Sequence, residues 1–315
     1  MRFNPKARID QSQVEVRRGG GRGGGFGGGL GGGGARLPIP TGGKGGLGIG
    51  GIILVVLLYV LVQCVGGGVG GGGGGTGSSG ATGEQTTNEC RTGEDANSSD
   101  ACAIDLFTTS VQDYWDQAYP DQTGEAYQAI RTVRFEGSTQ SGCGQASSEM
   151  GPFYCPDDKL VYLDTTFFDD MLRGQLGAQG GPFAIGYVIA HEYGHHVEDL
   201  QGDLGRIRTQ QGADSDAVRV ELKADCLAGM WARSATRTQD QDGQTIISDL
   251  TEDDIRRAID AAEAVGDDRI QQRSGGRVDT DSFTHGSAAQ RVKWFNIGLE
   301  QGSLEACDTF SARRL

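Results

Sequence analysis

Apolar side chains recur at the three- to four-residue spacing of a helix over much of the chain after residue 100. A short apolar run at 160–163 follows two aspartates and predicts a strand. We expect a loop over 266–283, whereas 127–133 fits either a strand or a helix. Many helices beside a short sheet predict an α+β fold that is mostly helical. The expected helices span 104–118, 167–172, 183–200, 217–235, 251–265 and 287–299.

The first 90 residues have a different composition from the rest. Glycine fills 55 of the 315 positions and is concentrated before residue 84, and such a sequence does not bury apolar surface. Residues 1–46 are also basic, so we expect a disordered Gly-rich arm there. The Gly, Ser and Thr of residues 66–89 predict a flexible linker. One ordered domain of ordinary size is therefore expected over 90–315.

Between the arm and the linker lies an uncharged apolar run, residues 47–65. Its nineteen residues are about long enough to cross a bilayer as a transmembrane helix. Because the basic flank precedes the run, we expect the N-terminus in the cytoplasm and the domain outside the cell membrane. A cleaved signal peptide is the alternative, but the run lies deep in the chain and no A-x-A-like site follows it. We therefore expect an uncleaved single-pass anchor.

Charge divides the chain in the same way. Residues 1–65 hold eight Lys or Arg and two acids, a net charge of +6. Because the whole chain carries −14, residues 66–315 carry −20. Such an acidic domain argues against nucleic acid as a partner, since phosphates would be repelled. The sequence predicts no particular oligomeric state.

The cysteines favour disulfides over metal binding. Six of the seven fall in the expected domain, and none shows C-x-x-C spacing. Six cysteines allow fifteen pairings. We expect two pairs that close short local loops and a third that is left over. These pairs are Cys90–Cys102, Cys143–Cys155 and Cys226–Cys307.

The stretch with the clearest chemistry is an H-E-x-x-H pattern in the helix expected over 183–200. His191 and His195 are four residues apart, so on a helix they lie on one face and can share one zinc ion. Glu192 is expected to act as general base on the metal-bound water. His196 points to another face, which favours a structural or second-shell role. We expect Glu198 and Asp199 on a solvated face.

A second carboxylate pair follows on the helix expected over 217–235. Glu221 and Asp225 are four residues apart and share a face. Glu221 is the expected third protein ligand, and water would be the fourth. Asp225 is expected to accept the second ring N–H of a ligating histidine, which fixes its tautomer. An ordinary acidic surface pair is the alternative, but the upstream H-E-x-x-H motif favours ligands.

One more histidine precedes the last expected helix. We expect His285 at or before its N-terminus, where an N–H donor or a cation would stabilise the oxyanion of a tetrahedral intermediate. Arg291 lies six residues later and would assist it. A capping or surface histidine is the alternative. The strand at 160–163 is the expected partner for an extended peptide.

Together these motifs resemble a bacterial family, the "putative neutral zinc metallopeptidases" or YpfJ-like family, and the resemblance includes the basic arm and the apolar run. Its Glu-x-x-x-Asp element also resembles the gluzincins. The resemblance implies a zincin-like fold with a metal-binding helix, an edge strand for substrate and a helix that carries the third ligand. The segments that resemble the family are 142–144, 151–155, 161–164, 191–196, 221–229 and 285–291.

The sequence therefore predicts a membrane-anchored zinc endopeptidase that cleaves peptides or proteins. A non-catalytic surface protein with a structural zinc site is one alternative, and it would have four protein ligands. A zinc amidase that acts on cell-wall peptides is the other.

Overall fold

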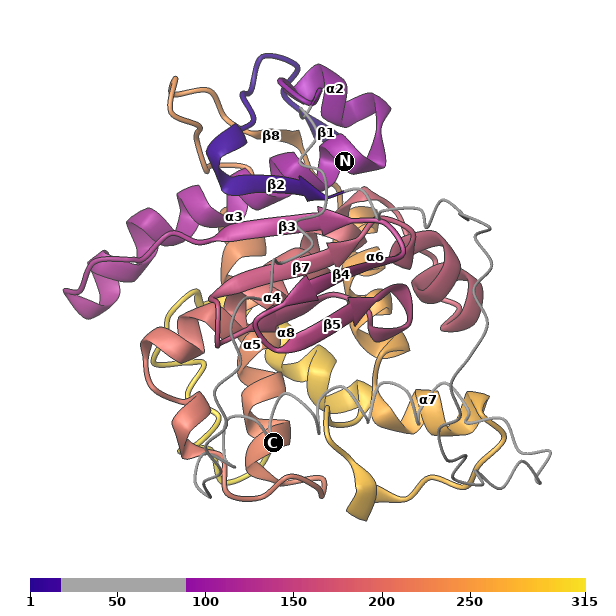
Figure 1. Ribbon diagram of the computed structural model, residues 1–315. Helices are drawn as coiled ribbons and strands as arrows, with labels where there is room; N and C mark the ends of the chain where they lie inside the picture. Colours follow the sequence, from indigo (N-terminus) through magenta and orange to yellow (C-terminus); the bar gives the residue numbers. More distant parts are fainter. Residues whose placement is uncertain (18–88) are drawn as a thin grey trace, which may run out of the picture.

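The structure, a computed structural model, describes residues 1–17 and 89–315. Figure 1 shows a sheet packed against a layer of helices. The strand order is β2–β3–β7–β6, with β2, β3 and β7 parallel and β6 antiparallel at one edge. The strands are β2 (Val14–Arg17), β3 (Arg131–Phe135), β7 (Leu160–Asp164) and β6 (Phe153–Cys155).

The long helices pack behind this sheet, and most of the largest buried side chains belong to them. Phe183 stacks on Trp231, with ring centroids 5.2 Å apart, and Phe107 packs edge-on against Trp231 at 5.9 Å. Gly186 leaves room for this cluster, because a Cβ there would lie 2.7 Å from both Phe107 and Trp231. The helices are α3 (Asp100–Thr123), α4 (Pro182–Leu200), α5 (Asp216–Ser234), α6 (Glu252–Ala264) and α8 (Ala288–Gln301).

Most long helices lie where apolar spacing predicted them. At α6, Thr251 and Asp254 form a reciprocal capping box, which satisfies backbone groups of its first turn. The prediction of a loop over 266–283 is wrong in part, because α7 (Asp267–Arg273) lies there. Ile270 is its one buried apolar side chain, so the short helix carries no apolar period to detect. Residues 168–175 form a π-helix, labelled η3, where an ordinary helix was expected.

The polar strands were missed. The hairpin of β4 (Ser138–Ser141) and β5 (Gly144–Ser147) has almost no apolar side chains, so it shows no alternation. A disulfide from Cys143 to Cys155 joins this hairpin to β6. The other two expected disulfides, Cys90–Cys102 and Cys226–Cys307, are also confirmed.

The position of β7 corrects one functional expectation. The strand predicted at 160–163 exists, but it lies between β3 and β6 and pairs with both. Its backbone groups are therefore already used, and an extended peptide cannot pair with it. Within the described part of the sheet, β6 is the edge strand on that side.

The expectation of disorder from the first residue is wrong for residues 1–17. Besides β2, they form β1 (Arg2–Phe3), which pairs antiparallel with β8 (Ile247–Asp249). A short α2 (Gly93–Ser98) packs beside β1. Composition averaged over 1–46 hid a first stretch, residues 1–17, that has no glycine and several apolar side chains.

The expected transmembrane helix, the linker and the rest of the arm lie outside the described residues. Among residues 1–17 and 89–315, no helix is both long and apolar enough to cross a membrane.

The packing of residues 1–17 gives a test of stability. Phe3 is 2% exposed and contacts Phe107, so Phe3→Ala should lower the free energy of unfolding by about 3–5 kcal/mol. Chemical denaturation of the full chain in detergent measures it. Lys6 is exposed, and Lys6→Ala should change stability by no more than about 0.5 kcal/mol. Equal effects of the two variants would show that the Phe3 side chain is not packed.

Candidate metal centre

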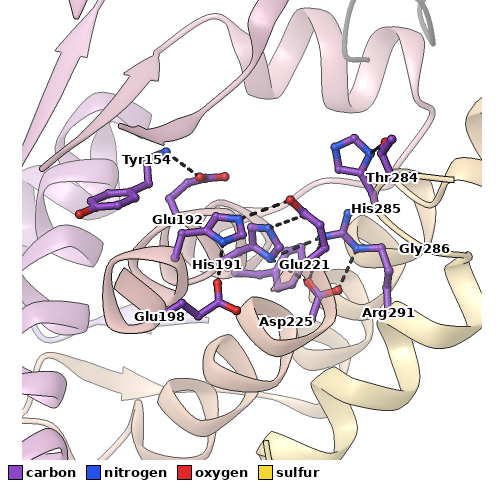
Figure 2. A network of polar contacts seen from close by, with 12 residues as sticks. Tyr154, His191, Glu192, Glu198, Glu221, Asp225, Thr284, His285, Gly286 and Arg291 are labelled. Atoms are coloured by element: carbon purple, nitrogen blue, oxygen red, sulfur yellow. Dashed lines mark hydrogen bonds and ion pairs between the residues drawn. The ribbon is translucent and has the colours of Figure 1, made fainter. Parts of the chain in front are cut away.

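The centre is built on α4, which starts at Pro182 after a glycine with φ 118°. His191 and His195 lie one turn apart on α4, with ring centroids 4.8 Å apart. Figure 2 shows His191 beside Glu221 and Asp225. The helix is buried along nearly its whole length, so both imidazoles are held inside the protein. The sequence-predicted pair therefore occupies one face, as two ligands of one ion require.

The third donor comes from α5. Gly194 packs directly on α5, because a Cβ there would lie 2.9 Å from the Ala224 Cα. Glu221 lies three residues before Ala224, on the same side of its helix. Its Oε2 is 3.3 Å from His191 Nε2, and its Oε1 is 3.6 Å from His195 Nε2. The close approach of the two helices thus brings the carboxylate to the histidine pair.

These three side chains fit a zinc ion. One ligand atom from each of His191, His195 and Glu221 lies within 4.8 Å of the other two. Two imidazoles and one carboxylate are a donor set that zinc accepts in hydrolytic sites. Both Nδ1 atoms are hydrogen-bonded to other carboxyl groups, and both Nε2 atoms lie toward Glu221.

Asp225 holds the first histidine, as predicted. His191 Nδ1 donates to Asp225 Oδ1 at 2.9 Å, and Asp225 is fully buried. Arg291 donates to both oxygens of Asp225, from Nε at 2.8 Å and from Nη2 at 3.0 Å. Tyr187 Oη donates to Oδ1 at 2.6 Å. The guanidinium of Arg291 is therefore directed at Asp225, which supports a positioning role over direct contact with an oxyanion.

Glu198 holds the second histidine, and the expectation that it is solvated is wrong. Glu198 is 0% exposed, and its Oε2 accepts from His195 Nδ1 at 2.8 Å. The available signal was its spacing, because a residue three positions after His195 lies on the same helix face. Asp199 is only partly exposed and accepts from Tyr154 Oη at 2.9 Å.

Neighbouring charges shift the pKa values of Glu221 and His191. Burial alone would raise the pKa of Glu221, but the neighbouring His285, His191 and His195 hold it well below its usual range. Burial alone would lower the pKa of His191, but the charge and hydrogen bond of Asp225 raise it to about 10. A metal ion that takes His191 Nε2 therefore has to displace a proton.

Glu192 lies beside the donors without belonging to them. Its Oε2 accepts from the backbone N–H of Tyr154, on β6, at 3.0 Å. The residue is 8% exposed, and burial raises the pKa of its carboxyl group above the usual value. A positioned carboxylate with a raised pKa is suited to taking up and returning a proton near neutral pH.

His285 reaches the centre from the loop before α8. The backbone N–H groups of Thr284, His285 and Gly286 all donate to Asp267 Oδ2, at 2.7 to 3.0 Å. Asp267 Oδ1 lies 3.2 Å from His285 Nδ1. The ring is thereby fixed at the wall of the cavity that also contains the three donors. Sequence reasoning missed Asp267, because an acid in an expected loop gives no signal.

His196 has the structural role expected of it. It is fully buried, and its Nε2 donates to the Gln128 carbonyl at 2.7 Å. Its Nδ1 lies 3.2 Å from Tyr154 Oη. His196 thus joins α4 to β6 and takes no part in the donor set.

A cavity of about 200 Å³ opens over the donors. Its wall is apolar apart from the donors, Glu149, Glu192, His285 and Arg291. Apolar side chains from β6, η3, α4, α5 and α7 contribute to it. The buried apolar residues in this wall include Phe153, Phe167, Met171, Leu176, Val188, Ile207, Val220 and Ile270.

The contact between Glu198 and His195 predicts the effect of one substitution on zinc binding. Glu198→Gln keeps the shape but replaces the carboxyl group that orients the ring, so the dissociation constant for zinc should rise about 10- to 100-fold. Competition with a chelating dye measures it. Glu300→Gln, on an exposed part of α8, should leave the constant unchanged. Equal constants for both variants would remove Glu198 from the centre.

Comparison with known proteins agrees with this geometry. The family described as "Putative neutral zinc metallopeptidase" matches residues 1–310. The uncharacterized protein YpfJ of Escherichia coli K12 is 41% identical over 288 residues, 88% of this chain and 89% of YpfJ. The uncharacterized protein Rv2575 of Mycobacterium tuberculosis is 49% identical over 230 residues, 72% of this chain and 76% of Rv2575. No solved structure matches the chain.

The match covers the donors, Glu192 and the loop that carries His285, and it begins at the first residue. The family description names zinc, and His191, His195 and Glu221 are placed so that they could hold a metal ion. The chain belongs to the family of putative neutral zinc metallopeptidases.

Proposed function

We propose that this protein is a zinc-dependent endopeptidase. The observation that carries the proposal is the position of Glu192, buried beside the donors and held by the Tyr154 N–H without ligating. A structural zinc site needs four protein ligands. In the described part of the chain three donors gather, which supports a catalytic site over a structural one.

The residues of the centre divide the chemistry between them. His191, His195 and Glu221 would hold the zinc ion, which when bound would act as a Lewis acid toward the carbonyl and the water. Glu192 takes the proton of the attacking water and returns it to the leaving amine. His285, held by Asp267, donates an N–H to the oxyanion that forms on the scissile carbonyl.

Two features of the site support an extended peptide as substrate. β6 is the sheet edge nearest the donors, and Tyr154 on this strand contacts Glu192. An extended peptide can bind by adding a strand at such an edge. The apolar cavity beside it fits a large apolar side chain next to the scissile bond. Attachment to the membrane through residues 47–65 belongs to this proposal on the sequence alone.

Removal of the general base tests the mechanism. Glu192→Gln should lower kcat/KM for a peptide by at least about 10²-fold, because no group then takes the proton from water. Zinc content should stay unchanged, since Glu192 is not a donor. Peptide cleavage and metal analysis on one preparation measure both, with Glu300→Gln as control. Equal cleavage by Glu192→Gln and wild type would sink the proposal.

The apolar wall predicts the preferred peptides. In quenched peptides that differ at one position, Leu or Phe next to the scissile bond should exceed Asp by about tenfold or more in kcat/KM. Mass spectrometry of the products locates the cleaved bond. No preference across the series would contradict the assignment of the cavity, whereas faster cleavage of a cell-wall peptide would favour an amidase.

A further inference from the structure

We infer that residues 1–17 and the domain over 89–315 lie on the same side of the membrane. The inference does not depend on peptidase activity. It rests on how deeply the first residues are built into the domain. Figure 1 shows β2 beside β3, at one edge of the sheet.

The pairing of β2 with β3 extends along four residues. Val14 is in register with Thr132, and Arg17 with Phe135, in parallel orientation. Thr132 in turn contacts Tyr193 of α4 through their hydroxyl groups at 3.0 Å. The β2 strand thus completes the sheet on which the metal-binding helix rests. Without it, β3 would present an unpaired edge beside buried side chains.

The residues before β2 are packed as core. Phe3, Ala7 and Ile9 are 2%, 0% and 5% exposed. Their backbone is held as well, since Ile9 donates to the Arg91 carbonyl at 3.0 Å. Both the side chains and the backbone of these first residues therefore contact residues far away in the sequence, such as Arg91 and Phe107.

Gly93, at the start of α2, lies directly against the backbone of the first residues. A Cβ at Gly93 would lie 1.9 Å from the Asn4 carbonyl oxygen, far inside contact distance. The Gly93 N–H also donates to the Ala7 carbonyl at 2.8 Å. The domain therefore leaves out a side chain where the first residues pass, and that space is needed only when they are docked.

A single membrane crossing is incompatible with this arrangement. Paired strands lie about 4.8 Å apart, whereas the hydrocarbon core of a bilayer is about 30 Å thick. If residues 47–65 crossed once, residues 1–17 and 89–315 would lie in different compartments. Exchange of the first strand with a second copy of the chain leaves the same conflict, because the partner domain is also on the far side.

Once residues 1–17 and the domain share one compartment, the basic flank and the disulfides predict different compartments for them. Positive charge before residue 47 favours a cytoplasmic N-terminus, while three disulfides favour an oxidising compartment for the domain. Because β2 pairs with β3, residues 1–17 and the domain must lie in the same compartment. The disulfides join residues of the folded domain, so we place residues 1–17 with it in the oxidising compartment.

Cysteine labelling of the full-length chain in intact cells tests the inference. Cys64→Ser provides the background, since the other six cysteines are paired. Lys6→Cys reports on the first residues and Ala126→Cys on the domain, and both positions are exposed. A membrane-impermeant maleimide is applied before and after permeabilisation of the inner membrane. Both sites should be labelled before permeabilisation, at similar rates.

The outcomes separate clearly. Labelling of Ala126→Cys but not Lys6→Cys in intact cells would overturn the inference and restore a single crossing. Protection of both until permeabilisation supports the shared side and overturns the oxidising compartment. Should either variant fail to accumulate, Arg2→Cys and Asp121→Cys are an equally exposed second pair.

Discussion

The centre depends on the contact between α4 and α5 at Gly194 and Ala224. No side chain separates the two backbones there, so the helices approach closely enough for Glu221 to reach both imidazoles. A larger residue at 194 would push the helices apart by more than the tolerance of a ligand set. The metal-binding pattern on α4 is therefore half of a site that helix packing completes.

The titratable groups of the centre are buried, and each one is paired with a hydrogen-bonding partner that offsets its loss of hydration. Each donor histidine has its own carboxylate, Asp225 for His191 and Glu198 for His195. Arg291 balances Asp225. Buried ions without partners are costly, so the positions of these residues depend on one another. The network fixes the histidine rings before a ligand arrives and keeps reorganisation small.

Sequence patterns with a fixed local geometry transferred well to the structure. The i to i+4 spacing of His191 and His195, the Glu221 and Asp225 pair and the long apolar helices needed only helix periodicity. Glu198 was judged by its charge rather than by its helix face, although its contact with His195 lies within α4. The other failures depended on contacts between distant segments, since Asp267 meets His285 through a loop whose path no pattern describes. Residues 1–17 were judged by average composition, although their order depends on the pairing of β2 with the edge of β3.

The pairing of β1 with β8 also fixes an order of events during synthesis. Phe3 leaves the ribosome among the first residues, but its strand partner Ile247 is made when most of the chain has already emerged. Ribosomes add about 5–20 residues per second, so the first strand waits for many seconds without its partner. Throughout that interval β1 lacks its partner strand, and the apolar run at 47–65 has already been made. The pairing of the earliest strand is therefore completed only after most of the protein has been synthesised.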